Sequence, residues 1–488
     1  MKRLDMLFFT VPMFSDGTLP PGVLMDDNYH GKDIPRGSLS IASFLGMKGK
    51  QSRVIVLDAF FPKRMESFDA LMKRTEELVE EKVEEYNPRF VGLDLMFGFR
   101  EKMVVRTAQF IKERFPDIVI LVGGNHATFT PERLLSRKRG SGIDIVVRGE
   151  GERTVEDLLS CKNLYDTAGV SFRDNGRVIH NPRREELPIL DLPPNNYSLI
   201  DGGKGVNFAR FNYMLQYLRG CNMHCSFCTN KTMWGERVRP HSIESFRTEL
   251  LTVMEGQGES LGDSMVILHD DNLMAAEKYW RPLFLVLEEG KKLYPKARFV
   301  GQARVSNAKN DDKKTHEMLE WAGKIGLGVV FLGIETGSQP IFDAMGKNCR
   351  VEWVEPACRN LKKHGIAVGA FWMFGHPGAT MEEEERSLAF LEHLLSEKLL
   401  DAVELHMTTP FPGTAIRSDP RVDVLVSEEE EPDKYCMANK FPIHRLVDPS
   451  TGNVVMSAEQ IAEILGRAHE IQRQYLGDVA AAVPASSI

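Results

Sequence analysis

The chain has 488 residues, of which 42% are hydrophobic and 27% are charged, and its formal net charge at pH 7 is −8. This length predicts two to four domains, and the negative charge argues against nucleic-acid binding as the main function. The sequence contains no apolar run long enough for a transmembrane helix and no signal-peptide pattern. Its seven cysteines, three of them clustered, are typical of a reducing compartment, so we expect a cytoplasmic protein.

Short apolar runs alternate with amphipathic helical patterns over residues 1–185, which is typical of βαβ units and a parallel sheet. The fold class is therefore α/β, beginning with a doubly wound, Rossmann-like domain. Open sheets of this kind bind ligands beyond the carboxyl ends of their strands. The expected strands are 4–11, 53–59, 90–96, 117–122 and 143–147, and the expected helices are 40–47, 66–86 and 101–115.

Two of these strand ends carry glycine-rich turns that lead into helices. The first turn, Gly-Gly-Asn-His-Ala-Thr, spans 123–128, and the second, Arg-Gly-Glu-Gly-Glu, spans 148–152. Glycine lets a backbone approach a large ligand closely, and a helix start can hold a polar or anionic group. The alternative is loop chemistry common to any α/β fold. The candidate ligand-binding residues are Gly123, Gly124, Asn125, His126, Thr128, Gly149, Glu150 and Glu152.

The first domain is expected to end in a hairpin and a linker. Residues 171–179 are predicted to form a β-hairpin, with Asn175 and Gly176 supplying the turn. Proline cannot continue a helix or a strand, so the proline-rich stretch that follows favours a linker over 186–204.

A strand-like run at 213–218 leads directly into Cys221, Cys225 and Cys228, with the spacing C-x3-C-x2-C. Thiolates suit iron–sulfur clusters, and a [4Fe–4S] cluster takes one ligand per iron. Three protein ligands leave the fourth iron open for a substrate or cofactor. A structural zinc site would need four ligands, and three close cysteines cannot pair evenly into disulfides.

Five further strands with intervening helices are expected, at 264–269, 298–305, 327–334, 366–374 and 401–408. Six such strands fit a partial (β/α)6 barrel over residues 205–415, and barrels carry their chemistry at the carboxyl ends of the strands. Asp270 and Asp271 follow the second strand, although a helix N-cap would explain them equally. Arg304 ends the third strand, where an ordinary ion pair is the alternative. Glu335 ends the fourth after an apolar run and must find partners.

The cysteine spacing, with Phe227 before the last cysteine, resembles the radical S-adenosylmethionine (radical SAM) superfamily. In that family the open iron binds SAM, and one electron cleaves SAM to a 5′-deoxyadenosyl radical. The segments 333–338, 369–378 and 408–414 are similar to the family's strand-end motifs, with Phe371 at a position that usually holds an isoleucine-type residue. The resemblance implies a [4Fe–4S] cluster on the three cysteines. It also implies SAM contacts by Phe227, Asp270, Asp271, Arg304, Glu335, Gly375 and Pro377.

The doubly wound domain placed before these cysteines resembles the cobalamin (B12)-binding domain of class B radical SAM enzymes. The resemblance implies that the candidates in 123–128 and 149–152 contact the corrin. The D-x-H-x-x-G motif, whose histidine ligates cobalt in other cobalamin proteins, is absent. His126 is therefore not expected to ligate cobalt. It either hydrogen-bonds to the cofactor or structures its own loop.

The resemblance implies a methyltransferase that moves a methyl group from methylcobalamin to an unactivated carbon after the adenosyl radical abstracts a hydrogen. A second SAM would then remethylate the cobalamin. The alternatives are a ring-forming, ring-contracting or oxidising enzyme with the same cofactors, a sensor without turnover, or an empty Rossmann-like domain. We expect a small-molecule or natural-product substrate of unspecified identity and an external flavodoxin- or ferredoxin-type electron donor.

Residues 416–488 are expected to form a C-terminal extension. The acidic run 428–431 predicts a solvated loop, and 457–475 predicts a helix capped by Ser457 with Glu459 nearby. The tail 480–488 is expected to be frayed. The four remaining cysteines show no cluster spacing and are expected to be buried or incidental. They are Cys161, Cys349, Cys358 and Cys436.

Overall fold

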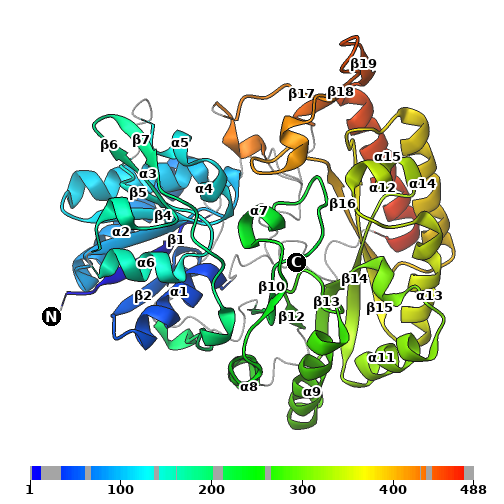
Figure 1. Cartoon of the computed structure of the whole chain (residues 1–488), viewed down its shortest axis with the longest axis horizontal. Helices are drawn as coiled ribbons and strands as arrows, with labels where there is room; N and C mark the ends of the chain where they lie inside the picture. Colours follow the sequence, from blue (N-terminus) through cyan, green and yellow to red (C-terminus); the bar gives the residue numbers. More distant parts are fainter. Residues whose placement is uncertain are drawn as a thin grey trace. The chain divides into compact units, whose positions relative to one another are not determined.

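The computed structural model of the chain is shown in Figure 1. It divides into two compact units, one formed by Met1–Asn207 with Ser427–Cys436 and the other by Phe208–Val426 with Met437–Ile488. Cys161, Cys436 and the expected frayed tail lie outside the described part. The described residues are 3–12, 34–60, 67–136, 142–160, 162–201, 213–258, 265–428, 430–435 and 442–477.

The first unit is built on an eight-stranded sheet of order β7-β6-β5-β4-β3-β1-β2-β8. The strands from β8 to β5 pair in parallel, and β6 and β7 add an antiparallel hairpin. The order reverses between β1 and β3, the point at which doubly wound sheets bind their ligands. The strands are β1 Met6–Thr10, β2 Ser52–Val56, β3 Phe90–Asp94, β4 Val119–Gly123, β5 Ile145–Val147, β6 Val170–Asp174, β7 Arg177–His180 and β8 Ile200–Asp201.

Helices cover both faces of this sheet, because α1 packs with α6 while α2 packs with α3. Strands covered on both faces are buried along their length, and every residue of β1 is buried. The expected α/β class and doubly wound arrangement are thus confirmed. The helices are α1 Arg36–Met47, α2 Phe68–Tyr86, α3 Glu101–Arg114, α4 Asn125–Phe129, α5 Pro131–Leu134 and α6 Glu152–Leu159.

Three local expectations for this unit can be compared with the structure. The hairpin turn is confirmed, with positive φ angles of 45° at Asn175 and 83° at Gly176. The strand expected to reach residue 59 is too long, because β2 stops at Val56 and Leu57–Phe60 forms a 3-10 turn. Strand β8 comes from the segment expected to be a linker and pairs in parallel with β2.

The second unit contains a six-stranded, all-parallel sheet of order β16-β15-β14-β13-β12-β9. The outermost strands β16 and β9 do not pair with each other, so the sheet is an open partial barrel, as predicted. The strands are β9 Met214–Leu215, β12 Val266–Leu268, β13 Phe299–Ala303, β14 Leu327–Glu335, β15 Ala367–Phe374 and β16 Ala402–Met407.

Helices lie along the outer side of this sheet, as Figure 1 shows for α9, α11, α13 and α14. The opposite, inner side carries an apolar cluster, which we call the inner cluster, of Ile267, Val300, Val329 and Phe331. Phe371 of β15 and Ala402 of β16 pack against it. The helices of this unit include α8 Ile243–Gln257, α9 Glu277–Leu293, α11 Lys313–Lys324, α12 Gln339–Met345, α13 Val354–Lys363, α14 Met381–Ser396 and α15 Ala458–Leu476.

The first expected barrel strand, 213–218, is wrong as a single element. It is split into β9 and β10 (Leu218–Arg219), and β10 pairs antiparallel with β11 (Arg239–Pro240) outside the barrel sheet. Oδ1 of Asp270 accepts hydrogen bonds from the backbone N–H groups of Tyr217 and Leu218. The Asp270 carboxylate therefore satisfies these two N–H groups at the point where the chain leaves the barrel sheet.

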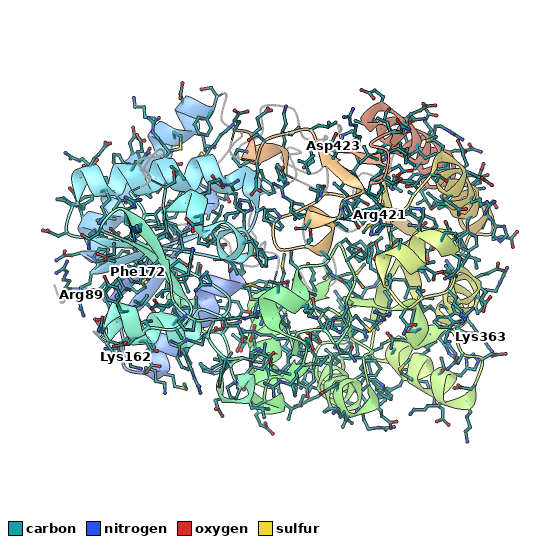
Figure 2. All side chains as sticks on the ribbon, turned by 45° about the horizontal axis from the view of Figure 1, so that its top comes forward. Arg89, Lys162, Phe172, Lys363, Arg421 and Asp423 are labelled. Atoms are coloured by element: carbon teal, nitrogen blue, oxygen red, sulfur yellow. The ribbon has the colours of Figure 1, made fainter. Side chains whose placement is uncertain are left out.

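A three-stranded antiparallel sheet of β17 (Val422–Val424), β18 (His444–Val447) and β19 (Val454–Met456) precedes α15. Ser457 caps α15 as expected, with Glu459 in the first turn, and Gln460 completes a capping box. Charged side chains such as Lys162 and Lys363 project at the surface, as seen in Figure 2. Among the described residues, no helix is long and apolar enough to cross a membrane.

Candidate functional site

The three clustered cysteines lie in the loop that follows β10, and all three are partly exposed. Cys228 accepts a hydrogen bond at Sγ from the Asn230 N–H at 3.4 Å, while burial raises the pKa of Cys228 to about 12 and also raises that of Cys221. Among the described residues, no three metal-binding side chains converge on one ion. In a [4Fe–4S] cluster each thiolate would bind a different iron. A bound metal would also reverse the preference for the neutral thiol.

His376 ties the cysteine loop to the turn after β15. Its Nε2 lies 2.8 Å from Ser226 Oγ, and its Nδ1 lies 2.8 Å from the Pro377 carbonyl oxygen. Burial lowers the pKa of His376 to about 4, so the ring is neutral, with Nδ1–H donating to Pro377 and Nε2 accepting from the serine hydroxyl. The Phe227 ring meets the His376 ring edge to face, with centroids 6.4 Å apart. The glycines of 369–378 drew attention to this segment in the sequence. No sequence pattern indicated that His376 links it to the cysteine loop.

Glu335 ends β14 and forms a buried ion pair with Lys347. The Lys347 Nζ to Glu335 Oε1 distance is 2.5 Å, and both side chains are only 8% exposed. The ammonium also lies 5.6 Å from the centroid of Phe227, the aromatic residue of the cysteine loop. Arg304 donates from Nη2 to the Lys347 carbonyl oxygen at 2.5 Å. The expected residues Phe227, Arg304 and Glu335 are thus brought together by Lys347, which no sequence motif indicated.

Asp270 and Asp271 have different environments. Asp270 is buried and supports the β9–β10 backbone, whereas Asp271 Oδ1 accepts from Asn230 Nδ2 at 2.6 Å, beside the cysteine loop. Burial raises the pKa of Asp271 to about 6, and within the described structure its Oδ2 has no hydrogen-bond partner. Neither residue caps a helix, because α9 begins at Glu277 with Ala276 as its N-cap. Asp271 is the one better placed to meet a ligand at the cysteine loop, because its partner Asn230 lies two residues after Cys228.

Gly375 forms the turn after β15, with φ of 79°. Its N–H donates to Glu384 Oε1 at 2.7 Å, and its carbonyl oxygen accepts from His444 Nε2 at 2.9 Å. Both backbone polar groups are thus used within the unit. Gly375 shapes the path of the chain toward Pro377, and this turn requires glycine because L side chains rarely adopt such a φ.

In the first unit, the two predicted glycine turns lie side by side at the carboxyl ends of β4 and β5. Gly124 has φ of 110°, and a Cβ there would lie 2.7 Å from the Leu95 carbonyl oxygen. Thr128 Oγ1 donates to the Gly124 carbonyl at 2.9 Å and accepts from the Gly149 N–H at 3.0 Å. Thr128 therefore links the two turns. Gly123 is less constrained, since its nearest contact from an added Cβ would be 3.7 Å.

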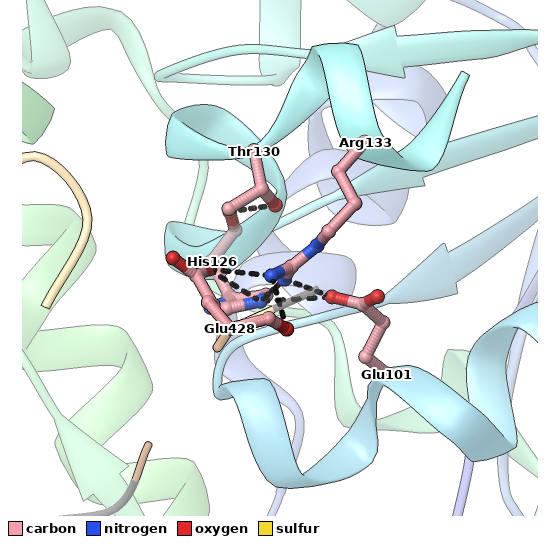
Figure 3. Close-up of polar contacts among 5 residues, drawn as sticks. All are labelled: Glu101, His126, Thr130, Arg133 and Glu428. Atoms are coloured by element: carbon pink, nitrogen blue, oxygen red, sulfur yellow. Dashed lines mark hydrogen bonds and ion pairs between the residues drawn. The ribbon is translucent and has the colours of Figure 1, made fainter. Parts of the chain in front are cut away.

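His126 lies in a buried charge cluster, formed with Glu101, Arg133 and Glu428 and shown in Figure 3. His126 Nε2 is 3.1 Å from Glu101 Oε2 and 2.6 Å from Arg133 Nη2. Arg133 also pairs with Glu101, and its Nη1 lies 2.8 Å from Glu428 Oε1. His126 is thus held by side chains of its own unit. The expectation of a solvated acidic loop is wrong for Glu428, whose side chain is 11% exposed because it neutralises a buried guanidinium.

The two glutamates of the second turn point into the protein. Glu152 Oε1 accepts from Ser40 Oγ of α1 at 2.7 Å, and Glu150 Oε2 accepts from the Leu187 N–H at 3.1 Å. Asn125 begins α4 directly after Gly124. These contacts hold the turn against α1 and against the segment that leads to β8.

Two apolar residues that the sequence analysis did not select follow β3 at the same sheet edge. Met96 and Phe97 are 40% and 43% exposed, although most large apolar side chains of this unit are buried. The Phe97 ring stacks on Phe99 at 5.3 Å. Exposed apolar side chains beside glycine turns, at the switch point of the sheet, fit a large and partly apolar ligand such as a corrin.

Comparison with known proteins agrees with this two-part arrangement. Residues 24–159 match the family model "B12 binding domain", and residues 215–391 match "Radical SAM superfamily". The "uncharacterized methyltransferase PH0819" of Pyrococcus horikoshii is 27% identical over 406 residues, which cover 79% of this chain and 79% of the relative.

Two further matches differ in what they show. The anaerobic magnesium-protoporphyrin IX monomethyl ester cyclase of Synechocystis sp. is 24% identical over 326 residues, covering 64% of this chain and 61% of the cyclase. Among solved structures, the radical S-adenosylmethionine methyltransferase TsrM from Kitasatospora setae matches with a TM-score of 0.66 at 15% identity, covering 96% of this chain and 88% of that one. At this identity the structural match concerns the fold.

Proposed function

We propose that this chain, which belongs to the cobalamin-dependent (class B) radical SAM enzymes, transfers a methyl group to an unactivated carbon of a small molecule. The family implies three cofactors, a [4Fe–4S] cluster, SAM and cobalamin. The observation that carries the choice of methylation is the match to a methyltransferase over 79% of both chains. A sensor without turnover would not need candidate SAM-contacting residues at the carboxyl ends of several barrel strands.

When bound, the cluster with SAM supplies a hydrogen-abstracting radical, and cobalamin supplies the methyl group, while the protein positions these groups. In this proposal Cys221, Cys225 and Cys228 hold the cluster. His376 fixes the loop that carries them, because its neutral ring joins Ser226 to the turn after β15.

The SAM site is proposed to lie around the Glu335–Lys347 ion pair. Asp271 has a carboxylate oxygen without a hydrogen-bond partner among the described residues and would receive the SAM ammonium. Lys347 stands next to Phe227 and Glu335 and offers a positive charge to the SAM carboxylate. The remaining proposed contacts are Asp270, Arg304, Gly375 and Pro377, of which Asp270 and Gly375 act through the backbone that they hold.

Cobalamin is proposed to bind residues 1–185 at the edge formed by the two glycine turns. Thr128 holds the turns together, and the exposed Met96 and Phe97 offer apolar contact. His126, Glu150 and Glu152 would support this edge from within the protein. Residues 205–415 would form the catalytic barrel, and 186–204 would connect it to the cobalamin-binding domain. Parts of 416–488 would belong to each of the two units. An external flavodoxin- or ferredoxin-type donor and a reducing cytoplasm belong to the same proposal.

The test begins with anaerobic purification in the presence of cobalamin, followed by metal and corrin analysis and ultraviolet–visible spectroscopy. We expect about four irons per chain, as a [4Fe–4S] cluster requires, together with a tightly held corrin. Cys225→Ala should lose the cluster and SAM cleavage while keeping the corrin. Iron without corrin in the wild-type protein would refute the cobalamin part of the proposal.

The similarity to the cyclase favours one second candidate, a radical ring-forming reaction without methyl transfer. SAM labelled in its methyl group separates the two functions. Methyltransferase activity places the label in the product, whereas a cyclase forms deoxyadenosine and leaves the label on methionine. An unlabelled product formed at the same rate as deoxyadenosine would decide for the cyclase.

A further inference from the structure

Two ionisable side chains lie on the inner face of the barrel sheet, outside the residues assigned above. Glu404 and His406 are two positions apart on β16, so they project to the same face. In the parallel pairing with β15, Phe371 stands opposite Glu404, and Met373 stands opposite His406. Phe371 and Ala402 pack on the inner cluster. The strand alternation therefore places both ionisable groups on that inner face, toward the carboxyl end of the strand.

Neither side chain has a hydrogen-bond or ion-pair partner among the described residues. Two buried acids elsewhere in this unit each have at least one partner: Glu335 pairs with Lys347, and Oε1 of Glu384 accepts from a backbone N–H. His406 Nδ1 is fully enclosed and has no hydrogen-bond partner in the described structure. A buried polar atom without a partner costs free energy, so such an atom in a binding region would gain from a hydrogen bond to a ligand.

Among the residues that the structure describes, no positively charged side chain compensates the pair. Burial alone raises the pKa of Glu404 to about 7, with no contribution from a charged neighbour. Burial lowers the pKa of His406 to about 4, and His469 of α15 adds a smaller repulsion. At neutral pH, His406 is therefore a neutral ring with one free lone pair. The Glu404 carboxyl group would lose its proton when a cation binds beside it, because the cation stabilises the carboxylate.

We propose that Glu404 and His406 bind the amino group of the substrate, and that this substrate is an amine with an otherwise apolar body. An ammonium group carries three donors and no acceptor, which matches two acceptors on one face. A charge-assisted hydrogen bond to Glu404 is stronger than a neutral one, whereas an anionic substrate would be repelled. The apolar body would lie against Phe371 and Met373. This inference rests on the proposed function, since it names the substrate class of the same site.

The test measures binding, not turnover, with phenethylamine and 2-phenylethanol as probes of equal shape. The cluster- and corrin-loaded protein is saturated with SAM first, so that the amino group of SAM is already placed. Calorimetry should show that the amine binds at least about tenfold more tightly than the alcohol. Glu404→Gln keeps the shape but removes the charge, and it should reduce this preference to about twofold or less.

Matched variants distinguish recognition from general damage. Glu470→Gln, at an exposed site of α15, should leave the preference unchanged. His406→Asn should weaken amine binding and leave the iron and corrin contents as in wild type. Equal binding of amine and alcohol would overturn the inference. So would an unchanged preference in Glu404→Gln, or no binding of either probe.

The experiments distinguish a failure of this inference from a failure of the proposed function. A protein that binds the amine through Glu404 but transfers no methyl label would refute methylation and support this inference. A protein that methylates a substrate without an amino group would support methylation and overturn this inference.

Discussion

At the scale of single residues, several side chains in the site have pKa values that differ from those of the free amino acids, and two glycines have unusual backbone conformations. Burial keeps His376 neutral, raises the pKa of Glu384 to about 8, and leaves Asp271 with a pKa of about 6. Gly124 and Gly375 occupy backbone conformations that favour glycine. Each of these states depends on neighbours that are distant in the sequence, so each can be tested by one substitution.

Gly124→Ala should damage the first glycine turn. Gly124 has φ of 110° and ψ of 178°, a combination that costs other residues about 1–3 kcal/mol. An added Cβ would also meet the Leu95 carbonyl at 2.7 Å. We expect a lower melting temperature of the apoprotein and weaker corrin binding, measured by absorbance titration.

Gly123→Ala is the matched control for this substitution. An added Cβ at Gly123 has only ordinary contacts, and its φ is not in the positive region. The apoprotein should therefore melt close to wild type. Equal losses of melting temperature in the two variants would contradict the role given to the Gly124 backbone.

Glu384→Gln should change how stability depends on pH. The folded-state pKa is about 8 and the ordinary value is 4.5, so between these values the folded protein retains a proton that the unfolded chain has released. The contribution of Glu384 to stability is therefore present below pH 4.5 and is lost as pH rises through about 8. Glutamine does not titrate, and its amide oxygen can still accept the Gly375 N–H.

The measurement is the melting temperature of the variant minus that of the wild-type apoprotein. This difference should increase from about pH 5 to about pH 8 and then level off. A difference that stays constant over this range would show that Glu384 is ionised in the folded protein.

At the scale of elements, the sequence indicated the helices and strands of the two sheets well, because each is an apolar run or an amphipathic pattern bounded by turn residues. The strands of the barrel carry the expected motifs at their carboxyl ends. Sequence patterns failed where a side chain from another element decides the outcome. Asp270 divides the first barrel strand, and Lys347 completes the site at Glu335 from the far end of α12. Neither contact has a local signal.

Lys347→Met should destabilise the barrel unit. It leaves the Glu335 carboxylate buried without its cation, and breaking a buried ion pair in this way costs about 3–5 kcal/mol. The measurement is the melting temperature of the apoprotein, together with SAM affinity in the cluster-loaded protein.

The double variant Glu335→Gln with Lys347→Met separates the two roles of this lysine. Removing both charges should recover much of the stability. SAM affinity should remain low, because Lys347 and Glu335 both belong to the proposed SAM site. Recovery of both properties would restrict Lys347 to neutralising Glu335.

At the scale of the whole molecule, the chain runs through the second unit, returns to the first at Ser427–Cys436, and then enters the second again. The returning segment is fixed at Glu428, which pairs with Arg133, and at Tyr435, which is completely buried. The acidic composition of this segment predicted exposure, because composition cannot show that a buried arginine lies 295 positions earlier in the chain.

Glu428→Gln should loosen the returning segment. The substitution removes a charge from the pair with Arg133, and hydrogen bonds to charged groups contribute about 1.5–3 kcal/mol. We expect faster amide hydrogen exchange in α5 and in 430–435. Glu430→Gln, at an exposed position of the same run, is the control and should exchange at the wild-type rate. Identical exchange in both variants would show that the pair does not hold the segment.

The return of the chain to the first unit has a consequence for biosynthesis. Residues 1–207 emerge from the ribosome more than 200 residues before Ser427–Cys436. At ordinary elongation rates this interval lasts on the order of ten seconds or more. During that time Arg133 and Glu101 are present without Glu428. The N-terminal unit is therefore translated first but completed late, and a nascent chain stalled within the barrel would carry an unfinished cofactor domain.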